Sequence, residues 1–182
     1  MINRYLILVC GRPGSGKSTL AKNIAKELRT VLIDKDCIDE PFSPDDRGPF
    51  YQENIEPKAY HALLNLAAIN LELGQTVLLD APWTHQMFRQ EELAPRVLEV
   101  AKKAGAKLMV LDVNVSEETL RQRLMKRGLK RDSEKFSKEG WEAFAKRMQL
   151  GRKNPLPHFV IDGERSPEEC LQQAITALQM KF

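Results

Sequence analysis

The stretch that decides the fold is VCGRPGSGKSTLAKNIAKEL, residues 9–28. Within it, the segment from Gly11 to Ser18 reads G-x-x-x-x-G-K-S, after an apolar run at 5–10 and before a helical pattern of apolar residues at 20–28. A strand, a glycine-rich loop and a helix in this order make the motif specific for phosphate. Glycines admit positive φ, so successive N–H groups can turn inward at the N-terminus of a helix and bind an anion. The sequence therefore predicts a cradle for the phosphates of a nucleotide.

The side chains of the predicted cradle have separate expected roles. Lys17 is expected to reach the β- and γ-phosphates of ATP, the Ser18 hydroxyl to ligate Mg²⁺, and Thr19 to pack or to contact the α-phosphate. The alternative is a glycine-rich turn with an exposed lysine, which does not explain the flanking strand and helix. The predicted nucleotide-binding residues of this loop are Gly11, Arg12, Pro13, Gly14, Ser15, Gly16, Lys17, Ser18 and Thr19.

Length and composition fit one domain over residues 1–182, because 42% hydrophobic residues suffice for one sizeable core. The sequence has no 18-residue apolar run, and it enters a strand without the regions of a signal peptide. We therefore expect a cytoplasmic protein without a membrane partner. The three cysteines are too few and too scattered for a disulfide framework or a C-x-x-C metal site.

The charge of the chain is unevenly distributed. The net charge is +3, but residues 121–153 hold 12 Lys and Arg against 4 Asp and Glu, a local +8 that leaves −5 for the rest. Such asymmetry indicates an anionic partner at one place rather than a general nucleic-acid surface, and the alternative is a solvated basic face. Arg147 and Arg152 are interpreted either as second-line phosphate contacts or as surface residues.

Five short apolar runs alternate with helical patterns, which predicts an α/β fold with a parallel sheet covered on both faces. Helices are expected at 58–73, before Gly105, after Ser116 and after the capping box that begins at Ser166. Residues 41–49 are predicted to form a loop. The predicted strands are Tyr5–Cys10, Val31–Ile33, Thr76–Asp80, Lys107–Val113 and His158–Ile161.

Carboxylates follow two of the predicted strands. Asp34 and Asp36 come after the second strand and Asp80 after the third. Ligands of an open parallel sheet bind beyond the carboxyl ends of its strands. One carboxylate there could orient Mg²⁺, and another could accept the proton of an attacking hydroxyl. Asp36 is the preferred base, with Asp34 as its alternative, and Asp80 is assigned to the metal shell or to acceptor orientation; a cap or turn role is the other interpretation of each.

The basic segment is predicted to close over the phosphates. Arg123 and Arg127 lie four residues apart on one helix face, and Arg131 follows Gly128. Guanidinium groups there would neutralise charge on the transferring phosphoryl group, so residues 127–153 are predicted to be a lid. Three apolar residues in this segment recur at helical spacing and are assigned to packing: Trp141, Phe144 and Met148.

With these pieces in place, the chain resembles the small P-loop kinases of the AAA-like ATP-binding family, whose relatives include polynucleotide 5′-hydroxyl kinases, zeta toxins and chloramphenicol phosphotransferases. The resemblance implies a five-stranded parallel sheet of order 2-3-1-4-5 with helices on both faces and a helical lid, and ATP·Mg²⁺ as donor. By motif position it implies Asp36 as base and Arg123, Arg127 and Arg131 as phosphate-contacting arginines. The motifs that carry it are GRPGSGKSTLA (11–21), LIDKD (32–36), VLLDAPW (77–83), ETLRQRLMKRG (118–128) with KRD (130–132), and FVIDGERSPEE (159–169).

One position departs from the polynucleotide kinases, which have an arginine three residues after the base where this chain has Asp39. The stretch from Asp34 to Arg47 holds six carboxylates and two cations, so a phosphate-bearing acceptor would be repelled. The expected function is transfer of the γ-phosphate to a hydroxyl of a small neutral or cationic acceptor. The alternatives are a 5′-hydroxyl nucleic-acid kinase and an ATP-binding or ATP-hydrolysing regulator. The identity of the acceptor and the oligomeric state stay open.

Overall fold

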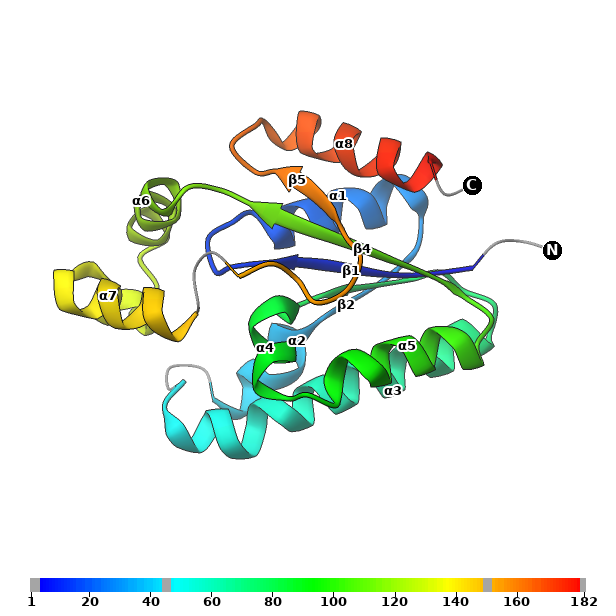
Figure 1. The fold of residues 1–182 in the computed structure, drawn as a ribbon, viewed down its shortest axis with the longest axis horizontal. Helices are drawn as coiled ribbons and strands as arrows, with labels where there is room; N and C mark the ends of the chain where they lie inside the picture. Colours follow the sequence, from blue (N-terminus) through cyan, green and yellow to red (C-terminus); the bar gives the residue numbers. More distant parts are fainter. Residues whose placement is uncertain (1–3, 44–46, 149–151, 181–182) are drawn as a thin grey trace.

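The computed structural model describes residues 4–43, 47–148 and 152–180. Five strands form one parallel sheet in the order β2-β3-β1-β4-β5 (Figure 1). This order confirms the predicted fold class. The strands are β1 (Tyr5–Gly11), β2 (Val31–Asp34), β3 (Val77–Asp80), β4 (Lys107–Asn114) and β5 (Phe159–Asp162).

Helices cover both faces of the sheet (Figure 1). On one face lie α1 (Lys17–Leu28) and α8 (Pro167–Gln179), and on the other lie α3 (Glu56–Glu72), α4 (Trp83–Arg89) and α5 (Leu93–Lys103). Each face packs its own hydrophobic cluster against the strands. All seven residues of the central β1 are buried, which explains why that strand reads as a continuous apolar run.

The helix ends confirm most of the capping predictions. The Ser116 hydroxyl accepts a hydrogen bond from the Thr119 N–H at 3.1 Å, and Ser166 forms a capping box with Glu169. The predicted loop at 41–49 is partly wrong. The short helix α2 (Lys35–Asp39) continues into a 3-10 turn over Glu40–Phe42, and a π-helical turn over Tyr51–Ile55 leads into α3. Pro41 fits the 3-10 turn because its fixed φ suits the start of a helix, where its missing N–H is not needed.

A third group of helices stands at the carboxyl edge of the sheet. It consists of α6 (Glu117–Arg127), a 3-10 segment over Lys130–Phe136, and α7 (Lys138–Arg147), all at the end to which β1 and β4 point (Figure 1). Leu120 and Leu124 of α6 pack against Trp141 and Phe144 of α7, with Met148 beside them, which confirms the packing predicted for the basic segment. In the ranges that the structure describes, no helix is long and apolar enough to cross a membrane.

Candidate active site

The loop between β1 and α1 has the geometry of an anion cradle. Gly14 and Gly16 take φ of 88° and 95°, which a residue with a Cβ rarely adopts. Gly16 is the N-cap of α1 and has no side chain with which to cap it, so no side chain occupies the N–H groups of the first turn. A Cβ on Gly14 would lie 3.1 Å from Leu124, because α6 packs closely against the loop. The backbone is therefore shaped to receive phosphate oxygens at the positive end of α1.

The other cradle residues lie around this backbone. The Ser15 N–H donates to the Arg12 carbonyl at 3.0 Å, and the Ser15 side chain is buried. Arg12 is half-buried near Asp112, Pro13 lines the cleft described below, and Thr19 is exposed. These residues thus shape the loop or its rim.

Lys17, Ser18 and Asp80 meet at the base of the cradle. The Lys17 Nζ lies 3.5 Å from the Ser18 Oγ and 3.9 Å from the Asp80 Oδ1. Asp80 is 2% exposed, and among the described residues its Oδ1 has no hydrogen-bond partner. Burial raises the pKa of this carboxyl, while Lys17 and Ser18 oppose the rise. A hydroxyl and an orphaned carboxylate oxygen fit Mg²⁺, which prefers hard oxygen ligands and needs few from the protein when phosphates and waters supply the rest.

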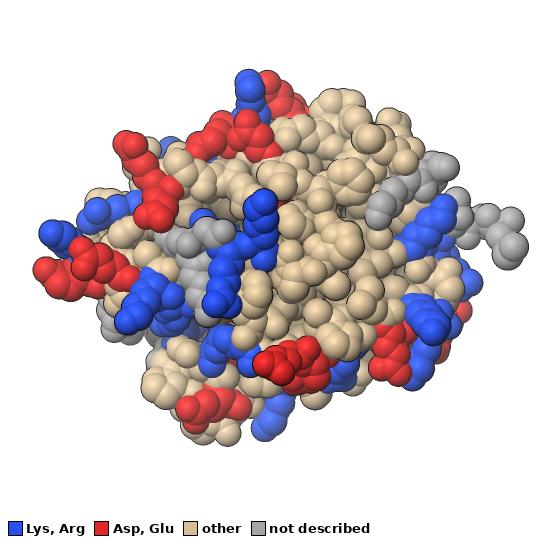
Figure 2. Space-filling view, viewed as in Figure 1, with Lys and Arg blue, Asp and Glu red and all other residues tan. Residues whose placement is uncertain are grey.

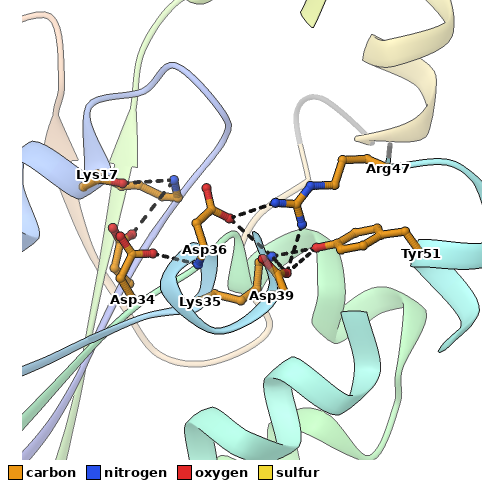
Figure 3. A network of polar contacts seen from close by, with 9 residues as sticks. Lys17, Asp34, Lys35, Asp36, Asp39, Arg47 and Tyr51 are labelled. Atoms are coloured by element: carbon orange, nitrogen blue, oxygen red, sulfur yellow. Dashed lines mark hydrogen bonds and ion pairs between the residues drawn. The ribbon is translucent and has the colours of Figure 1, made fainter. Parts of the chain in front are cut away.

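The two candidate bases occupy different places on α2. Asp34 ends β2 beside Asp80 of β3, and its Oδ1 caps α2 by accepting the Asp36 N–H at 2.9 Å. The Asp36 side chain is 42% exposed and lines the cleft. In Figure 3, Asp36 lies between Lys17 on one side and Arg47 on the other. The carboxylate that faces the cleft is thus that of Asp36, while that of Asp34 serves the helix start.

A buried polar network beside Asp36 was missed from the sequence (Figure 3). Lys35 and Asp39 are almost fully buried and form an ion pair across one turn of α2. The Tyr51 hydroxyl accepts from the Lys35 Nζ at 2.8 Å and donates to Asp39. The Arg47 guanidinium stacks 4.2 Å from the centre of the Tyr51 ring, and its NH1 lies 3.0 Å from the Asp39 Oδ2. An apolar residue at position 39 would leave two cations without this partner.

The network also sets the electrostatic surroundings of Asp36. Its Oδ1 lies 3.5 Å from the Lys35 Nζ and 3.8 Å from the Arg47 NH2. Two cations therefore hold the carboxylate in place. The only signal in the sequence is a lysine and an aspartate four residues apart, which is common on solvated helices.

The negative field expected between Asp34 and Arg47 is not what an acceptor would meet. Asp34 is engaged in capping, Asp39 is buried with two cations, and Asp36 alone of the described carboxylates in this stretch lines the cleft. Asp45 and Asp46 lie outside the described residues. Among the described residues of this stretch, the cleft is therefore lined by two cations, Lys35 and Arg47, and one carboxylate, Asp36, so a count of carboxylates along the sequence does not give the charge of the cleft.

The cleft measures about 570 Å³ and joins the cradle to α2, α4 and α7. Its wall holds more basic than acidic side chains. The basic ones are Lys17, Lys35, Arg47, Arg89, Arg127, Lys135 and Arg147, and the acidic ones are Asp36, Glu56 and Asp132. On the face shown in Figure 2, basic side chains gather toward the end where α6 and α7 lie, with acidic ones among them.

The predicted lid arginines have distinct positions. Arg127 lines the cleft and is held by the buried Asp132, with 3.0 Å between its Nε and the Asp132 Oδ2. Burial raises the pKa of Asp132, but hydrogen bonds from Lys135 and Arg127 outweigh this and lower it overall. Arg123 donates from NH1 to the Ser15 carbonyl at 3.1 Å and from NH2 to the Gly163 carbonyl at 2.9 Å. It therefore joins the cradle to the loop after β5.

Some of the predicted lid lies outside the residues that the structure describes. The side chain of Arg131 and residues 149–151 do not belong to the described part of the chain. The structure therefore brings Lys17, Asp36 and Arg127 to one cleft, and places Ser18, Asp80 and Asp34 beside them.

Comparison with solved structures gives the same architecture. A sugar kinase from Janibacter sp. matches with a TM-score of 0.67 and 16% identity, over 97% of this chain and 95% of that one. A gluconokinase from Sinorhizobium meliloti matches with a TM-score of 0.66 and 16% identity, over 96% and 91%. Kti12 from Chaetomium thermophilum, in complex with ADP-AlF3, matches with a TM-score of 0.64 and 20% identity, over 96% and 97%. At these identities the likeness concerns the fold.

Comparison of the sequences gives the family. No curated protein matches the chain significantly. The model of the AAA domain family matches residues 6–150, which include the cradle, Asp36, Asp80 and the arginines of α6. The chain therefore belongs to the AAA domain family and has the fold of P-loop kinases.

Proposed function

We propose that the chain transfers the γ-phosphate of ATP·Mg²⁺ to a hydroxyl group of a small acceptor. The observation that carries the proposal is that Lys17 and Asp36 line one cleft, so a phosphate donor and a hydroxyl acceptor can meet there. The sugar kinase and the gluconokinase, and the nucleotide complex of Kti12, agree with this use of the fold. A regulator that only hydrolyses ATP would not need a carboxylate held beside the cleft by two cations.

The proposed step is an in-line displacement at the γ-phosphorus. The acceptor oxygen forms a bond to phosphorus while the bond to the β–γ bridging oxygen breaks, and ADP leaves. Asp36 accepts the proton of the attacking hydroxyl, with Asp34 as the alternative base. Lys17 binds the β- and γ-phosphates.

The remaining residues of the site would bind Mg²⁺ or neutralise the charge of the phosphates. Ser18 and Asp80 would hold Mg²⁺, which supplies positive charge to the phosphate oxygens when bound. Arg127 and Arg131 would contact the transferring group after residues 127–153 close as a lid over a single domain, and Arg123 would support the cradle. Closure requires Arg127 to exchange Asp132 for phosphate, since Asp132 holds it in this structure.

A transfer screen tests the proposal. The protein is incubated with Mg²⁺ and ATP labelled in the γ-phosphate, together with alcohols, sugars, sugar acids, nucleosides or 5′-hydroxyl oligonucleotides. We expect the label in a small acceptor, and none with Lys17→Ala prepared in parallel as a control for contaminating kinases. Label found only in free phosphate would contradict the proposal, and label in the oligonucleotide would make the chain a nucleic-acid kinase.

A further inference from the structure

A second wall of the cleft, formed by α4 and α7, has no role in the phosphate transfer described above. His85 and Arg89 lie one turn apart on α4, and Arg147 is the last residue of α7. All three line the cleft that also contains Lys17 and Asp36. A group bound at this wall therefore shares the cleft with the reacting atoms.

Positive charge at this wall exceeds negative charge. Glu56 is the cleft carboxylate that pairs with this wall, with 3.3 Å between the Arg89 NH1 and the Glu56 Oε2. Burial raises the pKa of Glu56, while Lys35 and Arg89 oppose the rise. Among the described residues Arg147 has no carboxylate within ion-pair distance, and its guanidinium lies 6.0 Å from the centre of the Phe144 ring.

The other cleft carboxylates do not offset this excess. Asp36 has Lys35 and Arg47 as partners, and the buried Asp132 has Arg127 and Lys135. Each of these carboxylates thus already faces two cations. The charge of Arg147 is therefore available to a ligand.

His85 supplies a neutral polar group to the same cleft wall. Burial, and then the charges of Arg89 and Arg147, lower the pKa of His85 to about 4, so the ring is neutral near pH 7. The His85 Nδ1 is buried and has no hydrogen-bond partner among the described residues. A neutral imidazole offers one N–H to an anion, next to guanidinium groups whose planar geometry suits carboxylate and phosphate oxygens.

We propose that Arg147, Arg89 and His85 form a subsite for an oxyanion carried by the acceptor, a carboxylate or a phosphate. This rests on the proposed function and names the acceptor class, a hydroxylated acid or phosphate ester in place of the neutral or cationic alcohol expected from the sequence. The acceptor's anion binds at the α4–α7 wall while its hydroxyl reaches Asp36. The phosphates of ATP have the separate cradle at Lys17.

Binding of an inorganic oxyanion tests the subsite without turnover. The cradle is first filled with the non-hydrolysable analogue AMPPNP and Mg²⁺, and sulfate is then titrated while the melting temperature is followed. We expect sulfate to stabilise the wild type. In Arg147→Gln, the sulfate concentration that gives half of the maximal stabilisation should rise about tenfold or more, because a charged hydrogen-bonding partner is lost. Arg147 is the first choice because its replacement breaks no ion pair among the described residues.

Two further variants complete this arm. Arg96→Gln removes an arginine from α5, which does not line the cleft, and should leave the response unchanged. Arg89→Gln should weaken the response as Arg147→Gln does, with its own melting temperature as the baseline because Glu56 loses a partner. A wild type that does not respond to sulfate, or an Arg147→Gln variant that responds equally, would overturn the subsite.

Matched acceptors form the second arm. Transfer is compared for a sugar acid, a sugar phosphate and the corresponding neutral sugar, which distinguishes a carboxylate from a phosphate. We expect kcat/KM to be at least tenfold higher for one of the charged members, and Arg147→Gln to remove the difference by raising that acceptor's KM while the KM for ATP stays unchanged. Equal use of the neutral sugar would overturn the subsite but not the phosphotransfer. Label released only as free phosphate would overturn the proposed function, and the sulfate titration would still decide the subsite.

Discussion

The cradle and the acceptor side of the cleft are built in different ways. The cradle is one continuous loop, residues 11–18, and its geometry depends mostly on backbone. The acceptor side combines α2, Arg47, Tyr51, α4 and α7, and its Lys35–Tyr51 hydrogen bond spans 16 residues. Phosphates can be bound by any backbone of the right shape, whereas one acceptor among many must be recognised by side chains. We therefore expect mutations in the cradle to change nucleotide binding and mutations on the acceptor side to change acceptor choice, each without the other.

The largest separate response is expected at Asp36. Asp36→Asn keeps the shape of the side chain but removes the base, so transfer should fall by roughly 10² to 10⁴ while ATP binding persists. The measurements are single-turnover transfer and ATP titration. Asp34→Asn is the matched control two residues away. If transfer were normal in Asp36→Asn and abolished in Asp34→Asn, Asp34 would be the base.

Asp39 tests whether the acceptor side depends on its buried network. Asp39→Asn leaves Lys35 and Arg47 without their shared carboxylate, and breaking a buried ion pair costs about 3–5 kcal/mol. Urea unfolding should show this loss in the free energy of unfolding. The control is Asp162→Asn, which breaks an exposed pair with Arg165 and should cost under about 1 kcal/mol. Equal losses in the two variants would mean that the network contributes little.

The same contrast explains what could be predicted from the sequence. The cradle and the serine caps depend on residues close together in the chain, so spacing alone shows them. The strand order pairs segments far apart in the chain, and it was expected from the resemblance to the P-loop kinases rather than from spacing. The Lys35–Asp39 pair is local too, but the same spacing on a solvated helix would mean nothing. The pair is buried because Tyr51 and Arg47 contact it, and these two residues come close to α2 only in the folded chain.

The charge of the cleft could not be predicted for a related reason. Counting carboxylates between residues 34 and 47 gives a negative stretch, but the fold buries one of them against two cations and uses another as a helix cap. Arg89 and Arg147 then enter the same cleft from elements far along the chain. Net charge along the sequence therefore does not give the charge of a site assembled from several segments.

Arg127 tests the junction between the two regions. A lid arginine completes its contacts only on closure, so Arg127→Ala should lower kcat by roughly 10² to 10³ and change the dissociation constant of ATP only a few-fold. Arg127→Lys should restore little, because a point charge does not reproduce two-pronged contacts. Lys126→Ala, the neighbouring exposed cation on α6, should leave kcat unchanged. A variant Arg127→Ala with normal kcat and weak ATP binding would assign Arg127 to the cradle instead.

The smallest expected effect concerns the cradle alone. AMPPNP·Mg²⁺ should stabilise the protein without any acceptor, because the cradle needs only one loop and one helix end. At about 100 times the dissociation constant the gain is roughly 2.7 kcal/mol, which raises the melting temperature by about 5 to 10 °C in a domain of this size. Lys17→Ala should lose most of this rise, since its ammonium group is the charge that reaches the phosphates.

Two controls connect this measurement to the acceptor side. Lys22→Ala removes an exposed lysine further along α1 and should keep the full rise. Asp36→Asn should keep it as well, because Asp36 belongs to α2 rather than to the loop and lies 3.8 Å from the Arg47 NH2 on the acceptor side of the cleft. If Lys17→Ala retained the rise, ATP would bind elsewhere. If Asp36→Asn lost it instead, nucleotide binding and acceptor binding would share residues, and the separation between the two regions would be wrong.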